Sequence, residues 1–213
     1  MKLSLLITSF FILFTCSAQQ LKQYDKEFEF KEGIYLNFHQ FRRNNPIERS
    51  QIVSEFNKTE MDFLKQVVQL KTINYIDSIG VKRTVNTVEL WGYSNNNTVY
   101  INYKDDFNRV PFIGSLCHFT AMVTYYTRYR DPYMYGGMGT AMTLPSKQME
   151  QFIIDTDSGV IYSFSVETIE FLLQKDAVLL AEFQVLKRKK KRDSVFLYLR
   201  KYNEKHPLMF KVW

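Results

Sequence analysis

The sequence predicts an α+β fold: an antiparallel sheet, open or barrel-like, with a short N-terminal helix and C-terminal helices. Two patterns predict it. Aromatic and β-branched runs separated by turn residues fill the stretch from residue 73 to 164, and apolar residues recur at helical spacing from residue 165 onward. Strands that come first and helices that come last favour this class over alternating β-α-β units. The chain is 46% hydrophobic and 16% aromatic, so it can build a sizeable core.

The folded part begins at "EGIYLNFHQFRRNNPI", residues 32–47. Gly33 precedes a short apolar strand, and "RRNNP" indicates a turn. The next segment, "TEMDFLKQVVQL" at residues 59–70, predicts the short N-terminal helix, because its apolar residues share one helical face.

Three hairpins are predicted in the strand-rich stretch. "INYIDSIGVKRTV" turns at Ser78–Gly80, and "VELWGYSNNNTVYINY" turns at Asn95–Asn97. "MEQFIIDTDSGVIYSF" is the third, with Gly159 supplying a positive φ at the turn.

A longer strand, "VPFIGSLCHFTAMVTYY", lies between the second and third hairpins, with Gly114 as a bulge or bend. The glycines and prolines of "RDPYMYGGMGTAMTLPS", residues 130–146, then predict a mobile loop. "YGGMGT" lacks the Lys-Ser/Thr that follows a phosphate-binding loop, so we interpret it as flexible chain.

The C-terminal segment, residues 165–206, is predicted to be helical and basic. "VETIEFLLQ" and "DAVLLAEFQVLK" are helix candidates, and "DSVFLYLRKYNEKHP" is a third. Asp193 is a plausible cap for the last helix. Pro207 ends it, because the residue before a proline avoids the helical region.

Residues 1–18 have the features of a secretory signal peptide: a positive start, an apolar run over Leu3–Phe14 and small residues after it. Cys16 and Ala18 fit the small-x-small rule for cleavage before Gln19. In the alternative, Cys16 is a lipoprotein cysteine that anchors the chain. The sequence therefore predicts an exported protein, periplasmic or secreted, with residues 19–213 as a single domain and no transmembrane span in the mature chain.

The positive charge is concentrated near the C-terminus. Residues 187–205 hold nine basic and two acidic residues, a net of +7, whereas the whole chain carries +6. The centre of this segment is a run of six cations: Lys187, Arg188, Lys189, Lys190, Lys191 and Arg192. We interpret the run either as a solvated junction between helices or as a contact for an anionic envelope surface. Nucleic acid is not expected as a partner, because export removes the chain from it.

Aromatic residues of the second hairpin offer another candidate surface: Trp91, Tyr93, Tyr100 and Tyr103. Exposed on a sheet, they could stack on sugar rings, which would make the protein a carbohydrate-binding module. Alternation places Trp91 and Tyr93 on one face. A role in the core is the competing interpretation, and it is the one we favour.

The catalytic candidates are weak. Asp155 and Asp157 in "IIDTDSGVI" resemble the Asp-x-Asp motif of haloacid dehalogenase phosphatases, in which one carboxylate attacks phosphorus and the other transfers a proton. The same letters also encode a hairpin turn, which we favour over a phosphohydrolase.

Cys117 is adjacent to His118, but neighbours in a strand point to opposite faces, so the two cannot act as a nucleophilic pair. Cys117 is expected to be a buried small hydrophobe. His39, His118 and His206 lack metal-ligand spacing. We predict no metal, no cofactor and no catalytic residue.

Several stretches, "GIYLNFHQFRRNNP", "LWGYSNNNTVYINY", "FIGSLCHF" and "YLRKYNEKHPL", resemble small exported proteins of unknown function from Bacteroidota. The resemblance covers most of the mature chain. It implies an envelope location and supplies no activity. The sequence thus predicts an envelope protein that binds a protein or an anionic surface and leans away from enzymatic activity.

Overall fold

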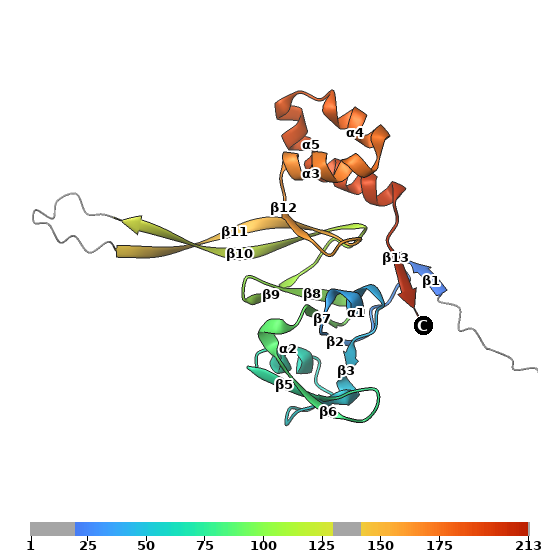
Figure 1. Cartoon of the computed structure of the whole chain (residues 1–213), viewed down its shortest axis with the longest axis vertical. Helices are drawn as coiled ribbons and strands as arrows, with labels where there is room; N and C mark the ends of the chain where they lie inside the picture. The colour runs from blue at the N-terminus through green and yellow to red at the C-terminus, as the bar shows by residue number, and fades with distance from the viewer. Residues whose placement is uncertain (1–19, 130–141, 213) are drawn as a thin grey trace, which may run out of the picture.

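The computed structural model describes residues 20–129 and 142–212, and it confirms the predicted α+β class. The predicted leader, with Cys16, lies outside the described residues. Small sheets form the lower part in Figure 1, a long hairpin crosses the middle, and helices form the upper part. Among the described residues, no helix is long and apolar enough to cross a membrane.

The elements follow in chain order. The strands are β1 (Gln20–Gln23), β2 (Gly33–Tyr35), β3 (Ile47–Glu48), β4 (Ile52–Val53), β5 (Thr72–Ile76), β6 (Lys82–Asn86), β7 (Gly92–Asn95), β8 (Thr98–Tyr103), β9 (Asp106–Arg109), β10 (Leu116–Tyr129), β11 (Met142–Asp155), β12 (Ile161–Ser163) and β13 (Met209–Val212). The α-helices are α1 (Phe38–Arg42), α2 (Phe63–Val67), α3 (Val166–Leu172), α4 (Ala177–Gln184) and α5 (Arg188–Lys205).

The strands of the described residues form four antiparallel sheets, with the orders β3-β2-β7-β8-β9, β4-β5-β6, β10-β11-β12 and β1-β13. Each sheet keeps two edge strands, so none closes, and the barrel-like alternative is wrong. A barrel needs an unbroken ring of paired strands. Here the short strands divide the pairing into separate sheets.

The three predicted hairpins are confirmed. β5 pairs with β6, β7 with β8, and β11 with β12. Asn96 and Asn97 both have positive φ, 48° and 53°, as a tight two-residue hairpin turn requires. Gly80 and Gly159 have φ of 82° and 76° in the other two turns.

The predicted loop at residues 130–146 is wrong in its last part. Residues 142–146 belong to β11, which pairs with β10 without interruption from Leu116↔Asp155 to Tyr129↔Met142. Residues 130–141 lie outside the described residues. Pro145 is tolerated because β12 pairs only with Phe152–Ile154, which leaves Pro145 on an edge strand.

Two further boundaries differ from the prediction. Gly114 forms a bend, one of the two predicted alternatives, but it lies before β10 rather than within a strand; a Cβ there would lie 2.4 Å from Nδ2 of Asn203. The segment predicted as strand and turn also contains α1, which begins where Oδ1 of Asn37 accepts a hydrogen bond from the Gln40 N–H at 3.0 Å. The predicted N-terminal helix is confirmed as the shorter α2.

The C-terminal segment is helical, as predicted, but its last helix begins earlier. α5 starts at Arg188, so Asp193 lies inside it and is not its cap. The apolar face of α5, which includes Val195 and Leu199, is buried against α3 and α4 and holds the whole 18-residue helix in place. The helix ends at Lys205, before Pro207, as predicted.

Three apolar clusters form the interior of the described part. The β10–β11 sheet separates two of them: Cys117, Phe119 and Phe152 join the middle cluster, whereas Leu116 and Ile153 join the cluster beneath the helices. A third cluster surrounds α2 in the lower part. The base of the long hairpin is thus buried on both faces, which fixes the direction in which its outer part projects.

Candidate interaction surfaces

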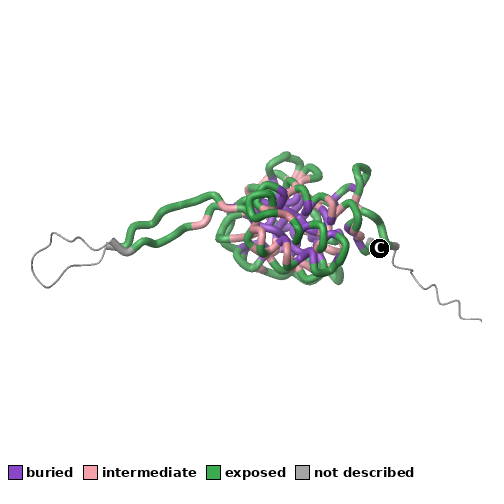
Figure 2. The backbone as a smooth tube through the Cα atoms, turned by 90° about the horizontal axis from the view of Figure 1, so that it is seen from above, coloured by how far each residue is buried: buried purple, intermediate pink, exposed green. Residues whose placement is uncertain are grey.

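The outer half of the β10–β11 hairpin projects from the body as a two-stranded ribbon (Figures 1 and 2). We call residues 122–127 and 143–149 the arm. The strand residues just inside it, Ala121 and Phe152, are buried, whereas nearly all arm residues are exposed. An isolated two-stranded ribbon is at best marginally stable in water.

The arm exposes large apolar side chains on both faces. Because residues paired across an antiparallel ribbon point to the same side, Met122, Tyr126 and Met149 share one face. Their exposed fractions are 42%, 71% and 71%. Tyr125 and Leu144 lie on the other face, and they are 40% and 49% exposed.

The arm is also almost uncharged. Lys147 is its one charged residue, although charged residues make up 23% of the whole chain. Exposed edge strands usually carry several charges that prevent aggregation. Here Pro145 disfavours pairing along the edge, while the two faces remain apolar. The sequence did not predict the arm, because the Gly and Pro residues of 130–146 favoured a loop where β11 begins. The apolar alternation in "AMVTYYT" and "TLPSKQM" was the available signal.

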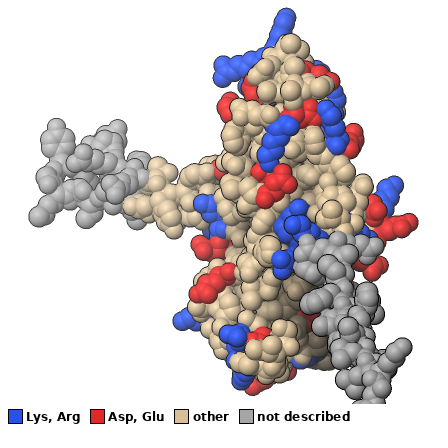
Figure 3. Space-filling view, turned by 45° about the vertical axis from the view of Figure 1, so that its right-hand side comes forward, with Lys and Arg blue, Asp and Glu red and all other residues tan. Residues whose placement is uncertain are grey.

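The six-cation run forms the start of α5 instead of a junction between helices. Lys187 is the N-cap residue, and the other five cations lie in the first turns of the helix. Figure 3 shows Lys and Arg side chains projecting from the helical end of the molecule. Lys191 differs from the others: it pairs with Glu170 at 3.3 Å, and its Nζ lies 5.3 Å from the ring centroid of Phe183.

The other five cations of the run are exposed, and none forms an ion pair with another described residue. The first turn of α5 holds no acidic residue, and Lys187 provides no side-chain cap. Cations at a helix N-terminus oppose the helix dipole, which costs about 0.3–1 kcal/mol for each charge. Val185, 82% exposed, lies just before them and adds an apolar group to this corner.

The candidate aromatic platform is not assembled. Tyr93 is buried and stacks on Tyr100 at 4.6 Å in the lower cluster. Trp91 instead stacks on Phe41 at 4.3 Å against the middle cluster, where Tyr103 also packs. Trp91 precedes β7, so the alternation that was expected to place it beside Tyr93 does not extend to it.

The two aspartates of the Asp-x-Asp segment hold the β11–β12 turn. Asp155 is buried; its Oδ1 accepts from the Asp157 N–H at 3.1 Å, and its Oδ2 accepts from the Ser158 hydroxyl at 2.9 Å. Lys175 Nζ bridges both carboxylates, at 3.0 Å from Asp155 and 3.1 Å from Asp157. These contacts account for the residues as parts of a turn.

Cys117 and His118 lie on opposite faces of β10, as predicted. The Cys117 thiol is buried and donates to the Gly114 carbonyl at 3.2 Å, and burial raises its pKa to about 12. The His118 ring lies 2.9 Å from Oε1 of Gln151, and burial lowers the pKa of His118. Among the described residues, no three His, Cys, Asp or Glu side chains gather as a metal site would require.

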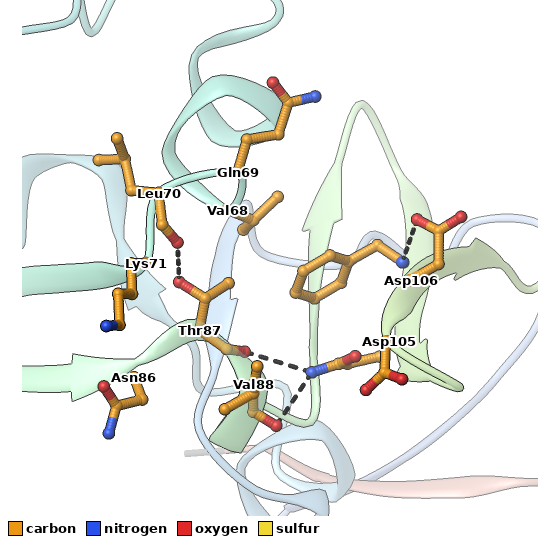
Figure 4. A pocket seen from close by; sticks show the side chains of 11 residues that line it. Val68, Gln69, Leu70, Lys71, Asn86, Thr87, Val88, Asp105 and Asp106 are labelled. Carbon is orange, nitrogen blue, oxygen red and sulfur yellow. Dashed lines mark hydrogen bonds between the residues drawn. The ribbon is translucent and has the colours of Figure 1, made fainter.

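A cleft of about 390 Å³ lies between the lower sheets, with Val68, Leu70 and Val88 among its lining residues (Figure 4). Its polar groups already bind one another. The Thr87 hydroxyl donates to the Leu70 carbonyl, and Asn102 Nδ2 donates to the Thr87 and Val88 carbonyls at 3.2 and 3.3 Å. These groups already have hydrogen-bond partners within the protein, so the cleft is a weak candidate for a ligand site.

Comparison with family models decides the family. The model of a family of unknown function, DUF6563, matches residues 33–206. The chain belongs to this family. The match runs from β2 to the end of α5, so it includes both the arm and the cation run. No curated protein and no solved structure matches the chain.

Proposed function

We propose that this protein is an exported, non-enzymatic interaction module of the cell envelope and that the arm is its contact with a partner protein. The observation that carries the proposal is the arm itself: a projecting ribbon with apolar side chains on two faces and a single charge. Protein interfaces are enriched in aromatic residues and Met and depleted of Lys, Glu and Asp at their centres.

The two apolar faces suggest how the partner binds. A partner that covered one face would leave the other in water, so we infer a groove that encloses the ribbon from both sides. Such a groove would bury Tyr126 and Met149 against one wall and Tyr125 and Leu144 against the other. The leader, whose features predict export, supports the envelope as the compartment.

The test is site-specific photo-crosslinking in the native cell. A photo-reactive amino acid at position 126 replaces a side chain that is 71% exposed, and the control at position 79 replaces Ile79, which is 77% exposed on the β5–β6 turn. We expect one discrete crosslinked protein from position 126 and none from position 79. Equal yields at both positions, or none at position 126, would contradict the proposal.

A second candidate function is binding to an anionic surface through the start of α5. The observation that favours it is the set of exposed, unpaired cations beside Val185. Each cation close to an anionic membrane adds on the order of 1 kcal/mol of attraction. Co-sedimentation with vesicles of anionic and of neutral lipid tests it. Binding that is limited to anionic vesicles and weakens with salt supports it, and equal sedimentation with both lipids excludes it.

A further inference from the structure

A pocket of about 290 Å³ lies where α1, the β11–β12 turn and β13 come together. These three segments are far apart in the sequence. Packing of Phe41 on Phe210, at 5.6 Å between ring centroids, joins α1 to β13. Gly159 allows the turn to approach α1, because a Cβ there would lie 2.7 Å from the ring of Phe38. The pocket therefore has a rigid apolar frame.

Basic side chains line this pocket. Arg42, Arg43 and His39 come from α1 and its C-terminal end, Lys211 comes from β13, and the hydroxyl-bearing Ser158 comes from the turn. The volume suits a small ligand, since pockets for larger organic ligands begin at about 300 Å³.

Arg42 carries the inference. Its guanidinium is partly buried, with Cζ 5.8 Å from the ring centroid of Phe210, and its Nη1 has no hydrogen-bond partner among the described residues. Burial lowers the pKa of Arg42, although the nearby carboxylates of Asp157 and Asp155 act in the opposite direction. An ionised donor left in this state is costly unless a ligand accepts its hydrogen bonds.

The charge balance selects the kind of ligand. Arg42 and Lys211 lie in the lining with one acidic residue, Asp157, and Asp155 also acts electrostatically on Arg42. Lys175 already binds both carboxylates, at 3.1 Å from Asp157 and 3.0 Å from Asp155. Because Lys175 neutralises the two carboxylates, the charges of Arg42 and Lys211 favour an anionic ligand. The planar fork of a guanidinium also fits phosphate oxygens in a bidentate manner.

We propose that this pocket, with Arg42 at its buried side, binds a phosphate group, either free phosphate or the phosphate of a small monoester or lipid headgroup. The site is separate from the arm and from the α5 cations. The guanidinium and ammonium groups of the lining supply the positive charge that a phosphate group requires.

The first experiment is a calorimetric titration of the full mature chain with inorganic phosphate. We expect saturable binding with one site, and Arg42→Gln should weaken it at least tenfold. Glycerol 3-phosphate and vesicles with phosphatidic acid then separate the two sources. If the protein binds the soluble ester, the ligand is a small monoester. If it binds the vesicles instead, and inorganic phosphate competes with that binding, the ligand is a lipid headgroup.

Two exposed residues make the test independent of folding. Lys211→Gln should weaken phosphate binding several-fold, and Asp157→Asn should strengthen it, because the lining loses a cation in one variant and its carboxylate in the other. The control, Lys189→Gln with Lys190→Gln, removes two cations at the start of α5 and should leave the affinity unchanged. The proposal fails if phosphate does not saturate, if Lys211→Gln and Asp157→Asn act in the same direction, or if the control weakens binding as much as Arg42→Gln.

Discussion

The indole ring of Trp91 stacks on Phe41 at 4.3 Å and meets the edge of Tyr35 at 6.0 Å, so it closes one side of the middle cluster. We predict that Trp91→Ala lowers the free energy of unfolding by about 3 kcal/mol, the low end for loss of a core aromatic because the ring is only partly buried. Tyr126→Ala on the exposed arm is the matched control and should change it by less than about 0.5 kcal/mol. Denaturant melts measure both. A stable Trp91→Ala protein that has lost a glycan ligand would restore the carbohydrate-binding alternative.

Asp176 connects the start of α4 to the end of α5. It is the N-cap of α4, and its carboxylate also binds Lys205 at 2.7 Å and His206 at 2.7 Å at the end of α5. Hydrogen bonds from Lys205 first, then from His206, lower the pKa of Asp176. A lowered carboxyl pKa stabilises the fold at every pH above the unfolded value of about 3.9, and this stabilisation is lost as the pH falls further.

We therefore predict that Asp176→Asn lowers the melting temperature at pH 7 and that the difference from wild type shrinks below pH 4. The matched control is Asp193→Asn, an exposed acid on α5, which should leave the curve unchanged. Melting temperatures measured from pH 2 to 8 test this. A difference that stays constant down to pH 2 would show that the ion pairs of Asp176 do not stabilise the fold.

At the scale of the elements, α5 begins with charges that its dipole disfavours. We predict that Lys189→Glu with Lys190→Glu stabilises the protein by about 0.3–1 kcal/mol for each changed residue, because acids are favoured at a helix N-terminus. The same charge change at exposed residues outside the helices, Lys31→Glu with Lys82→Glu, is the control and should give no comparable gain. Thermal melts at low salt compare the two. A loss of stability in the first variant would mean that the cations have partners in the folded protein.

The elements also show how far the sequence could predict the fold. Hairpin turns were predictable because Asn96, Asn97 and Gly159 satisfy backbone requirements that depend only on local residues. The start of α5 was not, because burial of its apolar face outweighs repulsion within the cation run. The position of Trp91 depends on Phe41, which is 50 residues away, and no local pattern contains that contact. The sequence could indicate a candidate surface made of neighbouring residues, such as the cation run. It could not indicate the pocket around Arg42, because that pocket is built from three segments far apart in the chain.

At the scale of the whole molecule, the β10–β11 sheet has two roles that divide along its length. Its inner half lies between the helical part and the lower sheets and contributes to two apolar clusters. Its outer half leaves the body and contributes little to either (Figure 2). This division predicts that folding depends on the inner half, and the proposed function places partner binding on the outer half.

Truncation of the arm tests that division. Replacing residues 124–147 with Asn-Gly keeps the pair Val123↔Gln148 as the last pair of a tight hairpin. We predict that the free energy of unfolding stays within about 1 kcal/mol of wild type, because the removed arm residues 124–127 and 143–147 are exposed and a shorter connection costs less closure entropy. The partner protein is first identified by crosslinking through position 126 of the full-length arm. The truncated protein should no longer bind that partner in a pull-down, whereas it should still bind phosphate at the Arg42 pocket. A truncated protein that unfolds would show that the arm belongs to the folding unit, and one that still binds the partner would place the contact elsewhere on the body.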